Sequence, residues 1–189
     1  MSRFVFEETS IGGVYTVQSF VSEDNRGNFI KYFEKEIFAE NGIDFADSED
    51  FITCSLKNVV RGMHFQLHHP QKKLVNVIRG KVYDVVVDLR KDSPTYKKWE
   101  GWYLTQENRT GLVIPEGCAH GFMSLSDDSL VNYKCAGEYD KDTDTGIRFD
   151  DPDIGIDWPV NSFDLLTVGK RDQRLMSFKE FDESCDFEY

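Results

Sequence analysis

Two histidines stand in sequence settings from which they could exchange protons with a ligand. His64 lies in a strand predicted over residues 59–65, where alternation places it on the face opposite Met63 and Phe65. His120 follows a turn that contains Pro and Gly and leads into another predicted strand. Because an imidazole has an ordinary pKa of about 6.5, either side chain is suited to act as a base near neutral pH.

Further groups with acid–base or charge chemistry lie on neighbouring predicted strands. Tyr133 belongs to a strand predicted over residues 130–135, and alternation gives its phenol the opportunity to face the same interior as His64. Lys73 and Asp84 lie on the intervening strands. Taken singly, these residues have structural explanations: a core tyrosine, an interior histidine, a surface lysine. Their joint occurrence in one barrel pattern favours a proton-transfer site.

A metal site is the main alternative for the two histidines. The segments around His64 and His120 resemble the paired motifs of cupin barrels, where metal-binding members supply His-x-His and a downstream Glu from the first motif and one His from the second. Here Gln66 occupies the position of the second His, and no Glu precedes the next predicted turn. Too few ligands remain unless His68 or His69 contributes from the loop, so we expect no metal.

The elements that must position these residues are predicted to be β-strands. Apolar and β-branched runs at strand-and-turn spacing cover residues 51–56, 59–65, 74–78, 82–89, 99–104, 112–114, 121–125 and 130–135. Residues 79–81 and 127–128 separate such runs tightly enough to predict hairpins. Because no long helices separate the strands, we expect an all-β fold, a jelly-roll or cupin-like barrel.

Short helices are expected mainly after the first hairpin and near the C-terminus. The first hairpin is predicted around a turn at residues 23–27, and a helix follows at residues 35–41. Residues 147–159 are rich in Asp, Gly and Pro, which predicts a structured loop crossing the barrel. Weak helical periodicity over residues 164–181 belongs to a C-terminal arm at about 160–189.

The bulk properties exclude several classes of function. A length of 189 residues fits a single domain, 1–189, with a sizeable core. A net charge of −12 disfavours polymeric nucleic acid, and a small anionic ligand requires the basic residues to gather in one pocket. Four widely spaced cysteines, and the lack of an export signal or a long apolar run, predict a cytoplasmic protein with no membrane association.

Several longer motifs occur in a fixed order along the chain. They are RGMHFQ at 61–66, QKKLV at 71–75, VVVDLR at 85–90, IPEGCAHGF at 114–122, YKC at 133–135, GIRFDDP at 146–152 and IDWP at 156–159. This order resembles the dTDP-4-dehydrorhamnose 3,5-epimerase family over most of residues 12–175. The resemblance implies a jelly-roll enzyme that inverts C3, C5 or both in a nucleotide diphosphate 4-keto-6-deoxysugar, without metal or organic cofactor, in deoxysugar and surface polysaccharide biosynthesis.

The resemblance also implies a homodimer that exchanges N-terminal strands, about residues 1–33. It implies four catalytic roles. His64 matches the base, Tyr133 the proton donor, Lys73 the group near the 4-keto oxygen, and Asp172 the carboxylate that orients the base. Such an assignment is chemically consistent, because a proton next to a ketone is removable only if the enolate oxygen is stabilised, and inversion needs an acid on the face opposite the base.

The remaining site residues implied by the resemblance bind the substrate. They are Arg26, Phe29, Arg61, Gln66, His120, Tyr139, Asp144 and Arg171. The three arginines match positions around the diphosphate or nucleotide, where guanidinium groups pair well with phosphate oxygens. Tyr139 matches an aromatic residue that stacks on the base.

The chain departs from the family pattern where the substrate is held. Lys31 stands where a Glu is common, and Asn28 replaces a frequent aromatic residue. The usual Gln-x-Asn before the base segment is absent, and Glu49, Asp50 and Phe51 or the nearby residues stand there instead. These departures leave the nucleotide preference open.

Alternative functions follow from the same motifs. A 3-only epimerase, a 5-only epimerase or a ketoisomerase acting on another nucleotide sugar would need only a different substrate pose. A non-catalytic sugar-binding cupin would hold a ligand without transferring a proton. A metal-dependent cupin would require His64, His120 and a loop histidine to converge.

Overall fold

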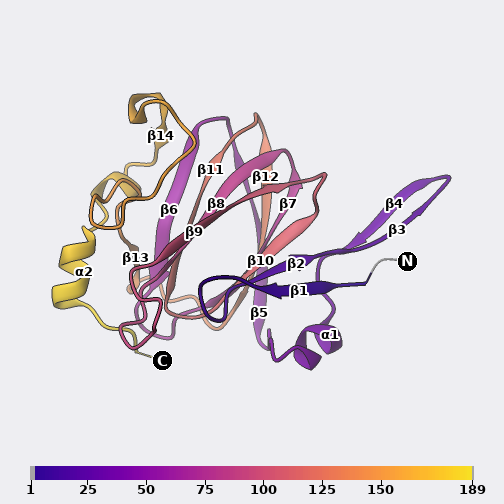
Figure 1. Cartoon of the computed structure of the whole chain (residues 1–189), viewed down its shortest axis with the longest axis horizontal. Coiled ribbons are helices and arrows are strands. Elements are labelled where there is room, and N and C mark those ends of the chain that lie inside the picture. Colours follow the sequence, from indigo (N-terminus) through magenta and orange to yellow (C-terminus); the bar gives the residue numbers. More distant parts are fainter. Residues whose placement is uncertain (1–2, 189) are drawn as a thin grey trace.

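The strands form two facing sheets, which are shown in the computed structural model of Figure 1; the structure describes residues 3–188. The first sheet has the order β1 (Val5–Glu8), β2 (Tyr15–Gln18), β10 (Thr110–Ile114), β7 (Lys72–Arg79), β12 (Ser129–Ala136) and β5 (Ser48–Ser55). The second has the order β13 (Asp144–Gly146), β6 (Val59–Gln66), β11 (Cys118–Ser124), β8 (Lys81–Asp88) and β9 (Trp99–Thr105), with β14 (Thr167–Val168) beside β6. The predicted jelly-roll fold is confirmed.

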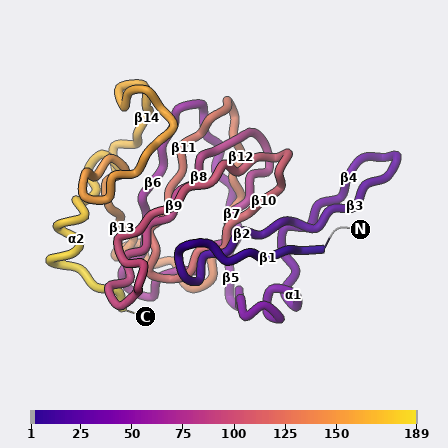
Figure 2. The backbone as a smooth tube through the Cα atoms, viewed as in Figure 1, coloured from indigo at the N-terminus to yellow at the C-terminus, as the bar shows by residue number. Residues whose placement is uncertain are grey.

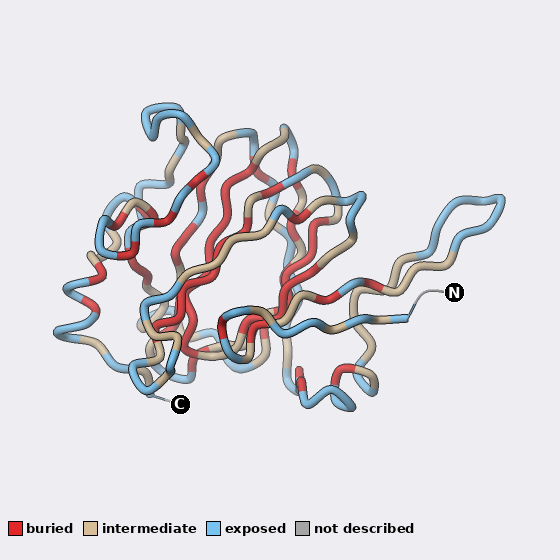
Figure 3. Tube along the Cα trace, viewed as in Figure 1, coloured by how far each residue is buried: buried red, intermediate tan, exposed pale blue. Residues whose placement is uncertain are grey.

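Two apolar cores flank the second sheet. Val75, Val86 and Phe122 pack in the interior between the sheets. Val85 and Phe65 belong to a second core, on the outer face of the same sheet. The strands β6, β8 and β11 therefore have buried residues on both faces, as the buried colour over most of β8 and β11 in Figure 3 shows, and this explains why their sequences are rich in apolar residues.

A C-terminal arm covers the outer face of the second sheet. It contains η1 (Phe163–Leu165), η2 (Asp172–Arg174) and α2 (Phe178–Ser184), and Figure 1 shows it beside β6 and β13. Phe178 and Phe181 on α2 enter the outer core, and Ser177 caps the helix in a reciprocal pair with Glu180. Residues 147–159 form the predicted loop, and Trp158 within it joins the same core.

The two hairpins predicted at residues 79–81 and 127–128 are wrong. Gly80 separates β7 from β8, but β7 pairs with β10 and β12, whereas β8 pairs with β9 and β11. Likewise β11 and β12 lie in different sheets. A short connection fixes only that two strands are near each other. Because both faces of β8 are apolar, its partners are set by long-range burial, and the turn at Gly80, with a φ of +82°, carries the chain from one sheet to the other.

The N-terminal region extends away from the barrel. Strands β3 (Phe20–Asp24) and β4 (Gly27–Lys31) pair only with each other, and the trace in Figure 2 shows their hairpin projecting from the body of the molecule. The predicted turn at residues 23–27 lies at its tip. The helix α1 (Lys35–Glu40) follows as predicted, and Phe38 anchors it in a small aromatic cluster.

The N-terminal strands differ in how they are paired. β2 pairs with β10 of the same chain, and β1 pairs with β2. Among the described strands, β3 and β4 form a sheet of their own, apart from the two sheets of the barrel. Within residues 3–188, the structure contains no helix with the length and apolar character that crossing a bilayer would require.

Candidate active site

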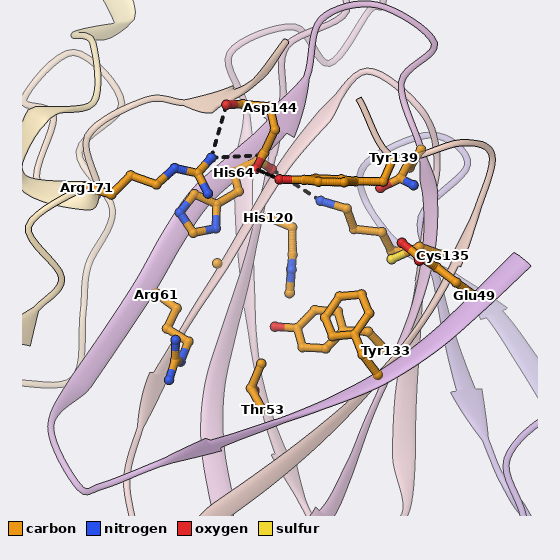
Figure 4. A pocket seen from close by; sticks show the side chains of 14 residues that line it. Glu49, Thr53, Arg61, His64, His120, Tyr133, Cys135, Tyr139, Asp144 and Arg171 are labelled. Atoms are coloured by element: carbon orange, nitrogen blue, oxygen red, sulfur yellow. Dashed lines mark hydrogen bonds and ion pairs between the residues drawn. The ribbon is translucent and has the colours of Figure 1, made fainter. Parts of the chain in front are cut away.

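A cavity of about 360 Å³ lies at one end of the barrel interior. It is lined by Glu49, Phe51, Thr53, Arg61, His64, Gln71, Lys73, His120, Gly121, Tyr133, Cys135, Tyr139, Asp144 and Arg171, most of which are labelled in Figure 4. Eight of the twelve residues predicted to form the site are among them. Strands of both sheets contribute, so the cavity depends on the whole barrel.

His64 is held by a carboxylate from the C-terminal arm. Its Nε2 lies 2.8 Å from Oδ1 of Asp172, and the backbone N–H of Gly62 donates to Oδ2 of the same carboxylate at 3.1 Å. Burial acts to raise the pKa of Asp172, but the hydrogen bond and charge of His64 outweigh it, so the pKa lies below its ordinary value. The ionised Asp172 accepts a hydrogen bond from Nε2–H, which leaves Nδ1 of His64 without a proton and able to act as the base.

Lys73 places an ammonium group near His64. Its Nζ donates to the backbone carbonyl of His64 at 3.5 Å. Burial lowers the pKa of Lys73, while the nearby Cys135 and Asp144 oppose that shift. Within residues 3–188 Lys73 forms no ion pair, so its charge is available to an anionic ligand or to a developing negative oxygen.

The phenol of Tyr133 is buried inside the barrel and lines the same cavity. Its ring stacks on Phe51 at 4.9 Å between centroids, and the edge of His120 lies 5.7 Å away. Burial raises the pKa of Tyr133 well above its ordinary value, and Asp84 adds to the shift. The hydroxyl is therefore protonated at neutral pH, as a proton donor must be.

His120 is paired with Asp84 in the barrel interior. Its Nε2 lies 2.8 Å from Oδ1 of Asp84, and both side chains are almost fully buried. Burial raises the pKa of Asp84, although the charge of His120 opposes it. The Cα atoms of His120 and His64 are partners in the pairing of β11 with β6. Their neighbouring glycines allow this approach, because a Cβ on Gly62 would lie 2.5 Å from the Cα of Gly121.

Charged groups at the cavity are partly paired. Arg171 contacts Oδ1 of Asp144 at 2.8 Å, and the Tyr139 hydroxyl donates to Oδ2 of that carboxylate at 2.9 Å. Arg61 donates from Nε to Oγ of Ser55 at 2.9 Å and has no carboxylate partner in the described part of the chain. Arg61 and Lys73 are therefore lining cations without a carboxylate partner among the described residues, and they can attract a small anionic ligand although Glu49 also lines the cavity and the net charge is −12.

Four predicted site residues do not line the cavity. Asp172 acts on it through His64. Gln66 lies behind the wall, where its amide donates to the carbonyls of residues 68, 69 and 138 and accepts from the N–H of Asp140, so it is a structural residue. Arg26 and Phe29 lie on the projecting hairpin, where Arg26 pairs with Asp24 and Phe29 is 59% exposed.

Six lining residues were not predicted as site residues. They are Glu49, Phe51, Thr53, Gln71, Gly121 and Cys135. The first three alternate along β5, and a period of two is the signal that could have found them. Cys135 is the register partner of Lys73 on the neighbouring strand, which places it beside that lysine.

The loop histidines do not converge on the cavity. His68 lies 3.7 Å from Oε1 of Glu188, and His69 lines a separate surface cavity with Lys72 and Glu116. Among residues 3–188 no group of three or more His, Cys, Asp or Glu side chains is arranged to hold a metal ion. His64 and His120 each bind a different carboxylate instead.

Known proteins match the chain over most of its length. The model of a family described as dTDP-4-dehydrorhamnose 3,5-epimerase matches residues 8–180. A protein of that name from Methanothermobacter thermautotrophicus is 47% identical over 180 residues, 95% of this chain and 97% of the relative. The dTDP-4-dehydrorhamnose 3-epimerase of Streptomyces niveus is 38% identical over 88% of this chain and 81% of the relative. The crystal structure of the dTDP-6-deoxy-D-glucose-3,5-epimerase of Legionella pneumophila, in complex with dTDP-4-keto-L-rhamnose, has a TM-score of 0.92 and 32% identity over 99% of both chains.

Proposed function

The chain belongs to the dTDP-4-dehydrorhamnose 3,5-epimerase family, and from that premise we propose how its cavity carries out the reaction. It is an epimerase, and therefore an isomerase, of deoxysugar biosynthesis. Its substrate is a dTDP-linked 4-keto-6-deoxysugar. The 4-keto group makes the hydrogens on C3 and C5 acidic, so each carbon can be inverted by removal and return of one proton.

In the first step Nδ1 of His64 removes a proton from a carbon next to the ketone. The C–H electron pair forms the C=C bond of an enolate, and the carbonyl electrons move to oxygen. Asp172 holds the ring through Nε2 and stabilises the imidazolium that forms. The ammonium of Lys73 stabilises the enolate oxygen, because a cation inside a barrel acts with little screening by water.

In the second step the Tyr133 hydroxyl returns a proton to the same carbon from the opposite face. The enolate collapses to the ketone with inverted configuration, and the tyrosinate that remains recovers its proton from solvent between turnovers. A donor distinct from the base is essential, because one group serving both roles would restore the original isomer. His64 then releases its extra proton, so the cycle leaves the enzyme unchanged.

The other lining residues hold the substrate. Arg61 and Arg171 bind the diphosphate, since guanidinium groups match phosphate oxygens and Arg61 has no competing carboxylate. Tyr139, half exposed at the rim, stacks on the thymine base. Asp144 fixes both Arg171 and Tyr139. His120, fixed by Asp84, contacts the sugar.

A single observation carries this proposal: His64, Lys73 and Tyr133 line one cavity. The test is to incubate the protein with dTDP-4-keto-6-deoxyglucose in D2O and to locate deuterium by NMR. We expect deuterium at C3 and C5 together with inversion. A protein that binds the sugar nucleotide without incorporating deuterium would be a sugar-binding cupin instead, and the proposal would be wrong.

The same experiment decides which carbon is inverted. The 3-epimerase of Streptomyces niveus is a relative at 38% identity, so single-site action occurs among the relatives of the chain. Deuterium at C3 alone or at C5 alone identifies the single-site activity. Parallel reactions with GDP- and CDP-linked 4-keto sugars test the nucleotide preference, which we propose to be dTDP.

We propose that the protein is one domain that acts as a cytoplasmic homodimer. The hairpin of β3 and β4 supports the dimer, because Arg26 and Phe29 lie outside the cavity of their own chain and could meet a substrate only in a second copy. Four cysteines without a disulfide among them support a reducing compartment. Light scattering of the purified protein measures the molar mass directly, and a monomer would contradict the proposed exchange.

A further inference from the structure

Phe51 occupies a wall of the cavity that distinguishes this chain from the family pattern. It lies on β5, in the segment from Glu49 to Ser55 where the Gln-x-Asn pattern of the family is missing. On this strand Glu49, Phe51 and Thr53 line the cavity, while Ile52 between them points to the other face and is 58% exposed. A flat apolar ring therefore forms part of the cavity wall.

Phe51 is the direct cross-strand partner of Tyr133. The pairing of β12 with β5 brings their Cα atoms opposite each other, and the rings stack at 4.9 Å with an angle of 11° between their planes. Phe51 is 44% exposed and Tyr133 only 8%, so Phe51 forms the outer cover of the phenol.

The orientation of the phenol depends on contacts to its ring. No residue from 3 to 188 hydrogen-bonds to the hydroxyl of Tyr133, which leaves that group free to meet a substrate. The edge of His120 lies 5.7 Å from the ring, and the base of the side chain packs in the interior core with Val75 and Val131. The stacked face of Phe51 is the restraint on the ring at the exposed side of the barrel.

We propose that Phe51 is a positioning residue that holds Tyr133 in the orientation for proton return and keeps water away from it. The inference rests on the proposed function, because it assigns Tyr133 as the donor. A phenol that is free to turn would miss the carbon, and water entering beside it could return a proton to either face. Phe51 therefore controls the fraction of deprotonated substrate that is inverted, and the deprotonation by His64 does not depend on it.

The test compares Phe51→Ala, Phe51→Leu and Phe51→Tyr with Ile52→Ala as a matched control on the same strand. For each protein, deuterium incorporation and inversion are measured separately in D2O. We expect Phe51→Ala and Phe51→Leu to lose inversion by about tenfold or more while deuterium incorporation stays within about threefold. Phe51→Tyr, which keeps a flat ring, should retain inversion. Ile52→Ala should show the incorporation and inversion of the wild type.

Two outcomes would overturn the inference. One is an equal loss of incorporation and inversion in the Phe51 variants, which indicates general damage to the cavity. The other is unchanged inversion in Phe51→Ala. A wild-type protein that incorporates no deuterium would instead contradict the proposed function, so the two failures are distinguishable.

A spectroscopic readout tests the covering role without using activity. The absorbance of tyrosinate is titrated in Phe51→Ala and in Phe51→Ala with Tyr133→Phe, and the difference isolates Tyr133. Removing the cover admits water, so the pKa of Tyr133 should fall from its raised value toward the ordinary value of about 10. An unchanged titration would show that Phe51 does not shield the phenol.

Discussion

Two carboxylates, each 2.8 Å from a histidine, have pKa values shifted in opposite directions. Asp172 also accepts the N–H of Gly62 and lies near Arg171, and its pKa is lowered. Asp84 is fully buried, its Oδ2 has no hydrogen-bond partner among the described residues, and its pKa is raised. The distance to a histidine therefore does not decide the direction of the shift. Solvation and the remaining hydrogen bonds do.

The roles of the base and the acid predict different defects when each is removed. His64→Ala should abolish deuterium incorporation, because no proton leaves the carbon. Tyr133→Phe should retain incorporation but lose inversion by on the order of 10²-fold or more, because the donor is missing. NMR in D2O measures both quantities. Full inversion by Tyr133→Phe would remove this residue as the donor.

Replacing Asp172 should change kcat more than KM. Asp172→Asn keeps the shape of the side chain but removes the charge that stabilises the imidazolium of His64, so kcat should fall by on the order of 10²-fold with little change in KM. Steady-state kinetics at several substrate concentrations separate the two constants. A rise in KM at unchanged kcat would mean that Asp172 helps to bind substrate instead.

At the scale of elements, the strands were predictable and their partners were not. The apolar runs located eight strands of the barrel to within a few residues, because β6, β8 and β11 are buried on both faces. The short β13 was missed, since its Asp-Thr-Gly sequence carries no apolar signal. The two false hairpins arose because a tight turn was taken to imply pairing, whereas in this fold it connects the two sheets.

The candidate site was also predictable only in part. His64 and Tyr133 were placed on the inner face by alternation along their strands. His120 was singled out by the turn before its strand, and Lys73 and Gln66 by the family resemblance. The amide of Gln66 is used by four backbone groups behind the wall. Neither the exposure of a side chain nor its backbone partners can be read from alternation.

The structure of the loop between β8 and β9 is expected to be stabilised by hydrogen bonds to Asp88. This buried carboxylate accepts from Arg90 at 2.8 Å, from Ser93 at 2.6 Å and from Thr95 at 2.7 Å. Asp88→Asn should lower the free energy of unfolding by about 2–4 kcal/mol at pH 7, since Arg90 loses its charged partner in a buried setting. Urea denaturation measures the change, and Asp92→Asn, at an exposed position of the same loop, is the control.

The difference in the free energy of unfolding between the wild type and Asp88→Asn should disappear in acid. Burial acts to raise the pKa of Asp88, but hydrogen bonds from Arg90, Ser93 and Thr95 outweigh it, so the pKa is lowered in the folded protein. A lowered pKa stabilises the fold above the unfolded value of about 3.9, and this stabilisation is lost as the pH falls through the folded pKa. Wild type and Asp88→Asn should therefore converge in stability as the pH falls below the unfolded value and through the lowered pKa of the folded protein. A constant difference across this fall in pH would contradict the assignment.

At the scale of the whole molecule, the projecting hairpin predicts that two chains share each site. Arg26→Ala and His64→Ala should each inactivate the homodimer, the first by weakening nucleotide binding and the second by removing the base. When the two variants are co-expressed, each mixed dimer contains one site without a substitution. That site combines His64 of one chain with Arg26 of the other. We expect about a quarter of wild-type activity from a random mixture. No recovery in purified mixed dimers would show that the hairpin serves its own chain or none.

The way the strands cross between the sheets has a consequence for how the chain acquires its structure during synthesis. β5 borders only β12, and β6 lies between β11 and β13, so these two strands have no neighbour in their sheets until the later strands leave the ribosome. Pairing between distant segments is slow to form, because the chain must first close large loops. Until then the apolar strands of the nascent chain stay exposed to other proteins, and a chaperone that binds such segments has its longest opportunity before residue 118 emerges.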